Sequence, residues 1–368
     1  MHGATMPLNR RQFLGLGGSG IAGLILTKQC SQMLARSETQ TALPFLPRGD
    51  QRIALISDLN SSYGSTSYVP QVHRGIKLLR RIKPDLVLCG GDMVAGQKLA
   101  LTPNQLDAMW SSFDRQLLRL LLAAGEPFAP TMGNHDASSS RGPTGYIYEL
   151  DRLHALKFWQ SRQDSLGLSF VDASHFPFRY SICHGDVFVV VFDASSAKVS
   201  EADWAWAQTQ LDGSLARKAQ LRLLMGHLPP YAISKGRDRA GEVLLEPRRL
   251  QKLLSRNNVH LYISGHHHAW YPSKVGLTNL LSLGAMGSGP RQRIDDRQAP
   301  QQTITLLDLF SELGELVETT IELNSLQVLL PNELPDSLQP SFGPKLNRRS
   351  TRVNFNTNYK TTNTQGFG

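Results

Sequence analysis

Five short polar segments of the sequence carry the side chains that metal-dependent chemistry requires. They are Asp58-Leu59-Asn60, Gly90-Gly91-Asp92, Gly133-Asn134-His135-Asp136, Gly226-His227 and Gly265-His266-His267-His268. Each follows a run of apolar residues that is typical of a buried strand, so carboxylate, amide and imidazole groups are expected to project together from strand ends. This arrangement is typical of a hydrolase site that holds two metal ions.

A two-metal site needs one carboxylate that bridges the ions, with further oxygen and nitrogen ligands on each. Asp92 is the best candidate for the bridge, because Gly90 and Gly91 let the backbone turn tightly next to the ions. A Gly-Gly-Asp sequence alone indicates only a turn, so this assignment depends on the other segments.

Asn134, His135 and Asp136 follow one another at the end of a strand predicted at 127–132. An amide oxygen can bind a metal, an imidazole can transfer a proton, and a carboxylate can orient that imidazole. A polar turn with a side-chain cap is the alternative interpretation of this segment.

The histidines near residue 267 give the sharpest signal. His266 and His268 are two residues apart on a segment expected to be extended, so both imidazoles can point toward the metals. A solvated histidine cluster is the alternative. His227 is a weaker candidate, since a buried, hydrogen-bonded histidine would also suit its position before Leu-Pro-Pro.

Apolar periodicity predicts strands and helices that alternate along most of the chain. We expect strands at 52–57, 86–89, 127–132, 178–183, 187–192, 221–225 and 260–264, and helices at 69–82, 103–124, 147–161, 200–215 and 246–255. Two β-rich stretches follow, at 271–283 and 303–322. This alternation favours an α/β domain whose sheet is buried on both faces.

Length and charge say more about the ends of the chain than about its partners. A chain of 368 residues with 40% hydrophobic residues can bury one large core, so we expect a single catalytic domain. The formal charge of +9 comes from residues 1–36 and 341–368, which contain basic but no acidic residues. The rest of the chain is formally neutral, and no stable nucleic-acid partner is expected.

The N-terminus resembles a twin-arginine export signal. Arg10 and Arg11 precede a glycine-rich apolar stretch that runs to Leu26. This stretch is shorter than the roughly 20 apolar residues of a membrane span. We therefore expect a signal peptide at 1–36, a linker at 37–50, passage through the twin-arginine translocase, and a periplasmic or extracellular mature protein without a transmembrane span.

The C-terminal segment 339–368 is rich in Asn, Thr, Arg, Gly and Ser and lacks periodic apolar residues, which predicts a disordered tail. Its Arg349 and Arg352 are expected to be solvated, with contact to an anionic surface as the alternative. Cys89 and Cys183 lie in apolar, strand-like runs and are expected to be buried free thiols, although a disulfide between them stays open.

Taken in order, the five polar segments resemble the calcineurin-like metallophosphoesterase superfamily, which includes the purple acid phosphatases. The resemblance covers about residues 52–290 and includes Asp193 after a hairpin strand, Trp204 in a helix, and the glycine-rich segment 283–289. It implies a catalytic domain at 51–325 with an α/β fold, a four-layer α-β-β-α sandwich of two mixed sheets flanked by helices.

The resemblance also implies two divalent metal ions, with Mn, Fe or Zn as candidates, and a role for each site residue. One ion would take Asp58, Asp92 and His268, and the other would take Asp92, Asn134, His227 and His266. Hydroxide held by the metals would attack phosphorus. His135, as general acid assisted by Asp136, would protonate the leaving oxygen.

Two positions depart from the family pattern. The family usually has His two residues after the first Asp, where this chain has Asn60. We expect Asn60 to be a metal ligand, but an amide oxygen is a weaker and harder ligand than imidazole, so the first ion should bind more loosely or be Mn²⁺ or Fe. Purple acid phosphatases add Tyr three residues after the bridging Asp. Ala95 stands there, so their charge-transfer colour is not expected.

The sequence therefore predicts an exported metallophosphoesterase that hydrolyses small-molecule phosphomonoesters or phosphodiesters. A nucleotide pyrophosphatase, and a non-catalytic metal-binding envelope protein with a degenerate site, are the alternatives. Lys235, Arg237 and Arg239 can hold a terminal phosphate or be solvated loop charges. Tyr63 can approach the metals or the substrate, or serve only in packing.

Overall fold

The computed structural model describes residues 46–355, and the folded unit begins at Arg48. The export signal predicted at 1–36 and most of the linker predicted at 37–50 lie outside the described residues. The end of that predicted linker already belongs to the fold, because the amide of Gly49 donates to the Asp308 carboxylate at 3.0 Å.

The first sheet has seven strands in the order β15-β14-β13-β1-β2-β3, and β18 also pairs with β14. Its strands are β1 (Gln51–Ile56), β2 (Leu86–Cys89), β3 (Phe128–Pro130), β13 (Thr303–Phe310), β14 (Glu315–Glu322), β15 (Val328–Leu329) and β18 (Arg352–Asn354). β1, β2 and β3 run parallel in level register, with Ile56 opposite Cys89 and Cys89 opposite Pro130. β13 is antiparallel to β1, so the sheet is mixed.

The second sheet has nine strands in the order β16-β17-β11-β12-β10-β9-β8-β7-β6. They are β6 (Ser169–His175), β7 (Arg179–His184), β8 (Val187–Val191), β9 (Leu221–Met225), β10 (Leu261–Ser264), β11 (Tyr271–Val275), β12 (Thr278–Ser282), β16 (Ser337–Leu338) and β17 (Leu346–Arg348). β8, β9, β10 and β12 are parallel, while β7 and β11 are antiparallel to their neighbours. β4 (Arg141–Gly142) and β5 (Gly145–Tyr146) form a separate pair.

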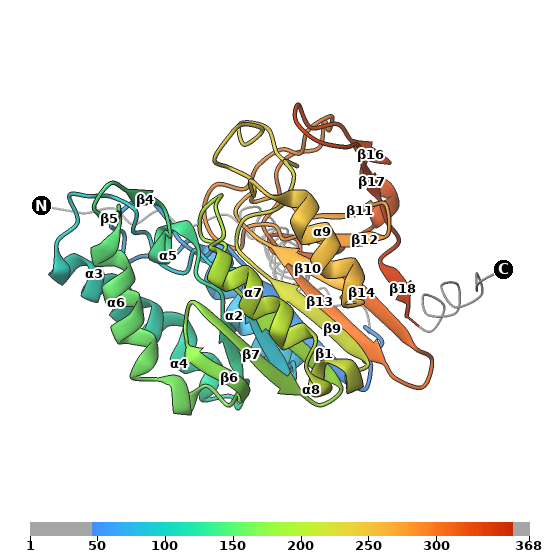
Figure 1. The fold of residues 1–368 in the computed structure, drawn as a ribbon, viewed down its shortest axis with the longest axis horizontal. Coiled ribbons are helices and arrows are strands. Elements are labelled where there is room, and N and C mark those ends of the chain that lie inside the picture. Colours follow the sequence, from blue (N-terminus) through green and yellow to red (C-terminus); the bar gives the residue numbers. More distant parts are fainter. Residues whose placement is uncertain (1–45, 356–368) are drawn as a thin grey trace, which may run out of the picture. The chain divides into compact units, whose positions relative to one another are not determined.

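The main helices connect parallel strands, and such crossovers cover the faces of a sheet. The first sheet has α2 (Pro70–Ile82), α3 (Pro103–Phe113) and α4 (Arg119–Leu122), and the second has α7 (Glu201–Leu211), α8 (Ser214–Lys218) and α9 (Pro247–Arg256). Figure 1 shows α7 and α9 on one face of the second sheet, where Arg249 of α9 pairs with Glu201 of α7 at 2.7 Å. The remaining helices are α5 (Asn134–Ala137) and α6 (Glu149–Gln160), with 3-10 turns at Gln163–Ser165 and Pro331–Glu333.

The other faces of the two sheets contact each other. The hydroxyl of Tyr180 on β7 donates to the carbonyl of Pro130 on β3 at 2.7 Å, and the side chain of Gln51 on β1 donates to the carbonyl of His184 on β7 at 3.0 Å. β2, β8, β9 and β10 are buried along their whole length, as strands between layers must be. These contacts confirm the predicted four-layer arrangement of helices and two mixed sheets.

Each strand and helix predicted before residue 323 is present, but two helices are interrupted. The helix predicted at 103–124 contains a π-helical segment at Asp114–Leu118 between α3 and α4. The helix predicted at 200–215 ends at Leu211 and restarts at Ser214, because Gly213 adopts an extended conformation between α7 and α8.

The prediction of a disordered tail is wrong for its first half. Within residues 339–355, β17 pairs with β11 and β18 pairs with β14. Arg349 is buried and donates to the Glu318 carboxylate at 2.7 Å, and Arg352 pairs with Glu315 at 3.0 Å. Composition misses this segment because backbone hydrogen bonds and ion pairs, rather than periodic apolar residues, hold it. Residues 356–368 lie outside the described part of the chain.

The structure also describes Cys89 and Cys183. Cys89 is buried, Cys183 is partly buried, and both are free thiols. Among residues 46–355, no helix is long and apolar enough to cross a membrane.

Candidate metal centre

The carboxyl ends of the parallel strands bring the predicted site residues together. Asp58 follows β1, Asp92 follows β2 and Asn134 follows β3, while His227 follows β9 and His266 follows β10 in the other sheet. The edges of the two sheets meet at this point, because the amide of His266 lies 3.1 Å from a carboxylate oxygen of Asp58.

A first group of potential ligands consists of Asp58, Asp92 and His268. Their ligand atoms lie within 4.8 Å of one another, and all three residues are buried. His268 Nδ1 donates to the carbonyl of Gly289 at 2.8 Å, and its Nε2 lies 3.2 Å from Asp58 Oδ1. Because the proton sits on Nδ1 in this contact, a neutral His268 presents the lone pair of Nε2 to the carboxylate.

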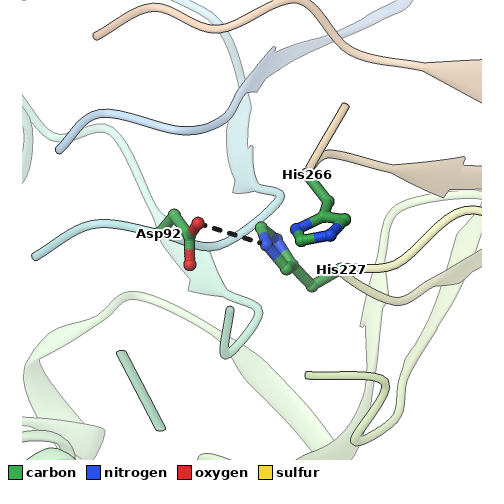
Figure 2. A group of neighbouring side chains, drawn as sticks. All are labelled: Asp92, His227 and His266. Atoms are coloured by element: carbon green, nitrogen blue, oxygen red, sulfur yellow. Dashed lines mark ion pairs between the residues drawn. The ribbon is translucent and has the colours of Figure 1, made fainter. Parts of the chain in front are cut away.

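A second group consists of Asp92, His227 and His266, whose ligand atoms also lie within 4.8 Å of one another (Figure 2). His227 Nδ1 donates to the carbonyl of Gly90 at 2.7 Å. Its Nε2 lies 3.3 Å from Asp92 Oδ2 and 3.0 Å from Asn134 Oδ1. The lone pair of a neutral His227 therefore faces two oxygen atoms.

His266 also keeps one ring nitrogen for the centre. Its Nε2 lies 2.9 Å from the Glu242 carboxylate and 3.1 Å from Arg237 Nη1, and in the tautomer that donates to Glu242 this nitrogen carries the proton. Its Nδ1 is buried and has no hydrogen-bond partner among the described residues. A buried lone pair without a donor is costly unless a cation occupies the space in front of it.

These residues fit a pair of divalent cations. In both groups, lone pairs of nitrogen and oxygen atoms converge, and they repel one another unless a proton or a metal ion lies between them. Asp92 belongs to both groups, as a bridging carboxylate would. A mixed set of carboxylate, amide and imidazole donors suits Mn, Fe or Zn.

The charges in the site are strongly coupled. Burial opposes protonation of His227, but the nearby Asp92 carboxylate outweighs it and raises the pKa of His227 to about 9. Burial alone would raise the pKa of Asp92, but His227 and His135 hold it well below its usual range. Burial lowers the pKa of His266 to about 4, so this imidazole stays neutral near pH 7. The site thus favours positive charge next to Asp92, together with a neutral imidazole ligand.

A family model described as calcineurin-like phosphoesterase matches residues 51–270 of the chain, which is more than half of it. The chain belongs to the calcineurin-like phosphoesterase family. This membership confirms the predicted superfamily and supports the predicted enzyme class, a phosphoric ester hydrolase. The family generally uses two divalent metal ions, which agrees with the two ligand groups around Asp92.

Solved structures show the same fold. The purple acid phosphatase PPD1 from yellow lupin (Lupinus luteus) seeds is 15% identical with a TM-score of 0.58, and the match covers 76% of this chain and 52% of that one. A dimetal phosphatase from Danio rerio is 13% identical with a TM-score of 0.53, covering 76% of this chain and 98% of that one. The chain thus spans about half the length of the lupin protein. No curated protein sequence matches it.

In this member of the family, four candidate ligands adopt left-handed backbone conformations. The φ angles are 52° at Asp58, 56° at Asp92, 64° at His266 and 53° at His268. The segment 266–268 is therefore not extended as predicted, and its two outer histidines join different ligand groups. A left-handed conformation costs an L-residue roughly 1–2 kcal/mol, so the surrounding structure must hold these side chains in place.

His135 lies at the edge of the centre. Its Nδ1 contacts the carbonyl of Gly96 at 3.1 Å, and its Nε2 lies 4.0 Å from Asp92 Oδ2. The His135 side chain keeps 15% of its surface exposed, in contrast to the buried ligands. Tyr63 lies beside it, with ring centroids 5.1 Å apart, and is exposed rather than packed in the core. His135 therefore meets both the metal centre and solvent.

Asp136 does not orient His135, in contrast to the prediction. Its Oδ1 accepts hydrogen bonds from the amides of Met93 and Val94 at 2.8 and 3.0 Å, and its Oδ2 accepts one from the amide of Gly133 at 2.9 Å. The carboxylate thus ties the loop after β2 to the loop after β3. Burial and the neighbouring Asp92 raise the pKa of Asp136 to about 7. Its role is to position both ligand loops.

Asn60 is buried beside the first ligand group. Its backbone amide donates to the backbone carbonyl of Asp92 at 3.1 Å, and its backbone carbonyl accepts from the backbone amide of Ser288 at 3.0 Å. The Asn60 side chain makes no hydrogen bond to another ligand candidate among the described residues. Ala95 is buried and has no group that can bind a metal.

Sequence reasoning missed Glu242, which contacts His266 from the loop between β9 and α9, 24 residues earlier in the chain. The same carboxylate accepts hydrogen bonds from Arg237 and, at 2.9 Å, from Arg239. No spacing in the sequence marks Glu242, because only the fold of the loop brings it to the histidine. His267 has a structural role: its Nδ1 accepts from the amide of Ile233 at 3.2 Å, and its Nε2 donates to the carbonyl of Glu242 at 3.0 Å.

A cavity of about 1020 Å³ lies between the loops that follow α5 and β8. Ser139, Arg152, Asp193 and Lys198 are among its lining residues, whereas none of the ligand candidates lines it. Asp193 accepts a hydrogen bond from Arg152 at 2.8 Å, so its carboxylate is part of a buried ion pair. The cavity lies apart from the metal ligands.

Proposed function

We propose that this protein hydrolyses phosphate esters of small molecules at a dinuclear metal centre. The observation that carries the proposal is that Asp92 belongs to two ligand groups at once, with His268 and Asp58 in one and His227 and His266 in the other. Membership of the calcineurin-like phosphoesterases supports the reaction type.

Asp58, Asp92, Asn134, His227, His266 and His268 would hold the cations, with Asn60 beside the first. When bound, two divalent cations lower the pKa of water and polarise a phosphoryl oxygen. The protein keeps the imidazole lone pairs directed inward through Gly90, Gly289 and Glu242. This rigid set of donors avoids a cost of reorganisation during the reaction.

We assign the general acid role to His135. Its Nδ1 is held by the carbonyl of Gly96, so Nε2 is the nitrogen free to give a proton to the leaving oxygen. Asp92 Oδ2 lies 4.0 Å from Nε2, so this nitrogen faces the metal centre. Partial exposure lets the ring regain a proton from solvent.

The test is a substrate panel on protein loaded separately with Mn²⁺, Fe²⁺ or Zn²⁺. We expect hydrolysis of phosphomonoesters or phosphodiesters with at least one metal and none after chelation. Asn60 favours Mn²⁺ or Fe²⁺ for the first ion, because its amide oxygen is a hard ligand. Two bound ions without turnover of any monoester, diester or pyrophosphate would contradict an enzymatic function and favour a metal-binding envelope protein.

The proposal also includes export by the twin-arginine translocase and action in the periplasm or outside the cell. Its support is the position of Arg10 and Arg11 before a short apolar stretch. Changing Arg10→Lys and Arg11→Lys together in the full chain should retain the protein in the cytoplasm, as cell fractionation would show. Unchanged export of this double variant would contradict the proposal.

A further inference from the structure

Four basic residues lie on two loop segments that the bridge between Ser234 and Arg293 joins, and three of their side chains have partners. Arg237 pairs with Glu242 at 2.5 Å, and Arg239 pairs with the same carboxylate at 2.9 Å. Lys235 donates to the side chain of Gln292 at 3.0 Å and to a backbone carbonyl. The basic residues that the sequence offered for phosphate binding are therefore engaged within the protein. The fourth is Arg291.

The segment that ends at Arg291 is attached to the first ligand group. The amide of Arg291 donates to the carbonyl of His268 at 3.0 Å. Two residues earlier, the carbonyl of Gly289 accepts from the ring of His268, and Ser288 contacts Asn60. The Arg291 side chain extends from this attachment to Gly236, where a Cβ atom would lie 3.6 Å from its Nη1. Arg291 thus spans from a metal ligand to the loop that carries Arg237.

The guanidinium of Arg291 has no partner in the described part of the chain. It makes no hydrogen bond and no ion pair there, and its Nε is buried without an acceptor. A guanidinium is always charged near pH 7 and offers five donors in a planar fork. Leaving a partly buried cation without an anion costs free energy that a bound anion would recover.

The other charges around Arg291 do not compensate its positive charge. Glu242 is shared by Arg237, Arg239 and His266, so it cannot neutralise another cation. Burial and Arg237 lower the pKa of Arg291, and Glu242 and Asp58 oppose this only in part. An anion that enters here meets an unpaired fork of donors beside the metal ligands.

We propose that Arg291 binds the terminal oxygens of the substrate phosphate and makes this centre prefer phosphomonoesters over phosphodiesters. The inference rests on the proposed phosphoesterase function and identifies its substrate class. A phosphomonoester carries about −1.5 to −2 charge near pH 7 and has three terminal oxygens. A diester carries a single charge and has two such oxygens, so it gains less from an additional guanidinium.

The test compares Arg291→Gln and Arg291→Lys with the wild type, using 4-nitrophenyl phosphate and bis(4-nitrophenyl) phosphate. Losing a hydrogen-bonded charge pair should lower kcat/KM for the monoester by about 10- to 100-fold, and for the diester by less than about 3-fold. Lys keeps the charge but lacks the planar fork of donors, so kcat/KM of Arg291→Lys for the monoester should lie between those of the wild type and Arg291→Gln. Arg297→Gln is the matched control. Arg297 is exposed on the same segment, and its substitution removes the same charge.

Two further measurements separate this inference from the proposed function. Metal content should be equal in wild type and both Arg291 variants, since the side chain is not a metal ligand. Inorganic phosphate should raise the melting temperature of the wild type and of Arg297→Gln, but less that of Arg291→Gln. If the metal-loaded wild type hydrolyses neither these esters nor any other member of the substrate panel, the proposed function fails, and phosphate binding still decides the role of Arg291. Equal losses on both esters, or equal stabilisation of all proteins by phosphate, would overturn the inference.

Discussion

The two ligand groups share Asp92 but differ in what holds them. In the first, a backbone carbonyl orients His268, the Ser57 hydroxyl donates to Asp58 at 2.7 Å, and the neutral Asn60 is buried beside the group. In the second, a carboxylate orients His266, and Asn134 adds a neutral oxygen beside His227. The second group therefore offers more nitrogen ligands and a charged outer partner.

This difference predicts unequal metal sites. A carboxylate that accepts the imidazole proton makes the other ring nitrogen more basic and fixes its direction, which strengthens a metal ligand. A backbone carbonyl also fixes the direction of the imidazole, but it carries less negative charge and so makes the other ring nitrogen less basic than a carboxylate does. We expect the second group to bind its ion more tightly, so that the first ion exchanges and is chosen by the supply of Mn²⁺ or Fe²⁺.

The largest effect should come from replacing Asp92, because this change disrupts both ligand groups and so abolishes the difference between their metal affinities. Asp92→Asn should lower kcat/KM by at least about 1,000-fold, since bound metals contribute several kcal/mol to transition-state stabilisation. Metal analysis should show loss of both ions. Asp186→Asn, in the exposed turn between β7 and β8, is the control with the same change of charge. Retention of two ions in Asp92→Asn would show that the carboxylate is not shared.

His135→Asn should be the next largest, and it should leave both groups filled. We expect kcat to fall by about 100-fold or more for esters with poor leaving groups, because the leaving oxygen loses its proton donor. The fall should be smaller for 4-nitrophenyl phosphate, whose leaving group departs without a proton. An equal fall for good and poor leaving groups would contradict the acid role.

Glu242→Gln tests the second group alone. The amide removes the negative charge next to His266 while keeping a similar shape, so affinity for one ion should fall by about 10- to 100-fold. Competition with a chelator would measure this change, and the other ion should be unaffected. If both affinities fall together, the carboxylate supports the loop rather than the histidine.

Asn60→His tests the first group and should give the smallest change. An imidazole in place of the amide should tighten the weaker site by about tenfold, or 1.4 kcal/mol. It should also shift its preference toward Zn²⁺. Metal titration followed by competition would detect a smaller gap between the two affinities, and an unchanged gap would mean that the residue does not reach the ion.

The sequence was sufficient to predict which candidate ligands lie close together, but not the groups that hold them in place. Asp58, Asp92, His227, His266 and His268 could be found because each follows an apolar strand, and level parallel strands bring their ends together. The supports depend on loops, whose paths leave no periodic signal. Asp136 lies next to His135 in the chain, yet its carboxylate binds three backbone amides that no sequence pattern indicates.

The same limit applies to the elements at the end of the chain. Long apolar strands such as β8 and β9 were predicted within about a residue, because burial on both faces requires continuous apolar runs. Strands of two or three residues, such as β16 and β17, bury too little apolar surface to show in composition. Arg349 indicated a solvated segment by its charge, but Glu318 provides it with a buried partner.

The attachment of residues 339–355 to both sheets has a practical consequence for anyone who shortens this protein. A version that stops at residue 338 would lose β17 and β18, and the outer backbone groups of β11 and β14 would lack their partners. Glu318 would also remain as a buried acid without its arginine. Unpaired sheet edges pair with other chains, so removal of residues 339–368 should yield aggregated protein rather than a shorter functional one.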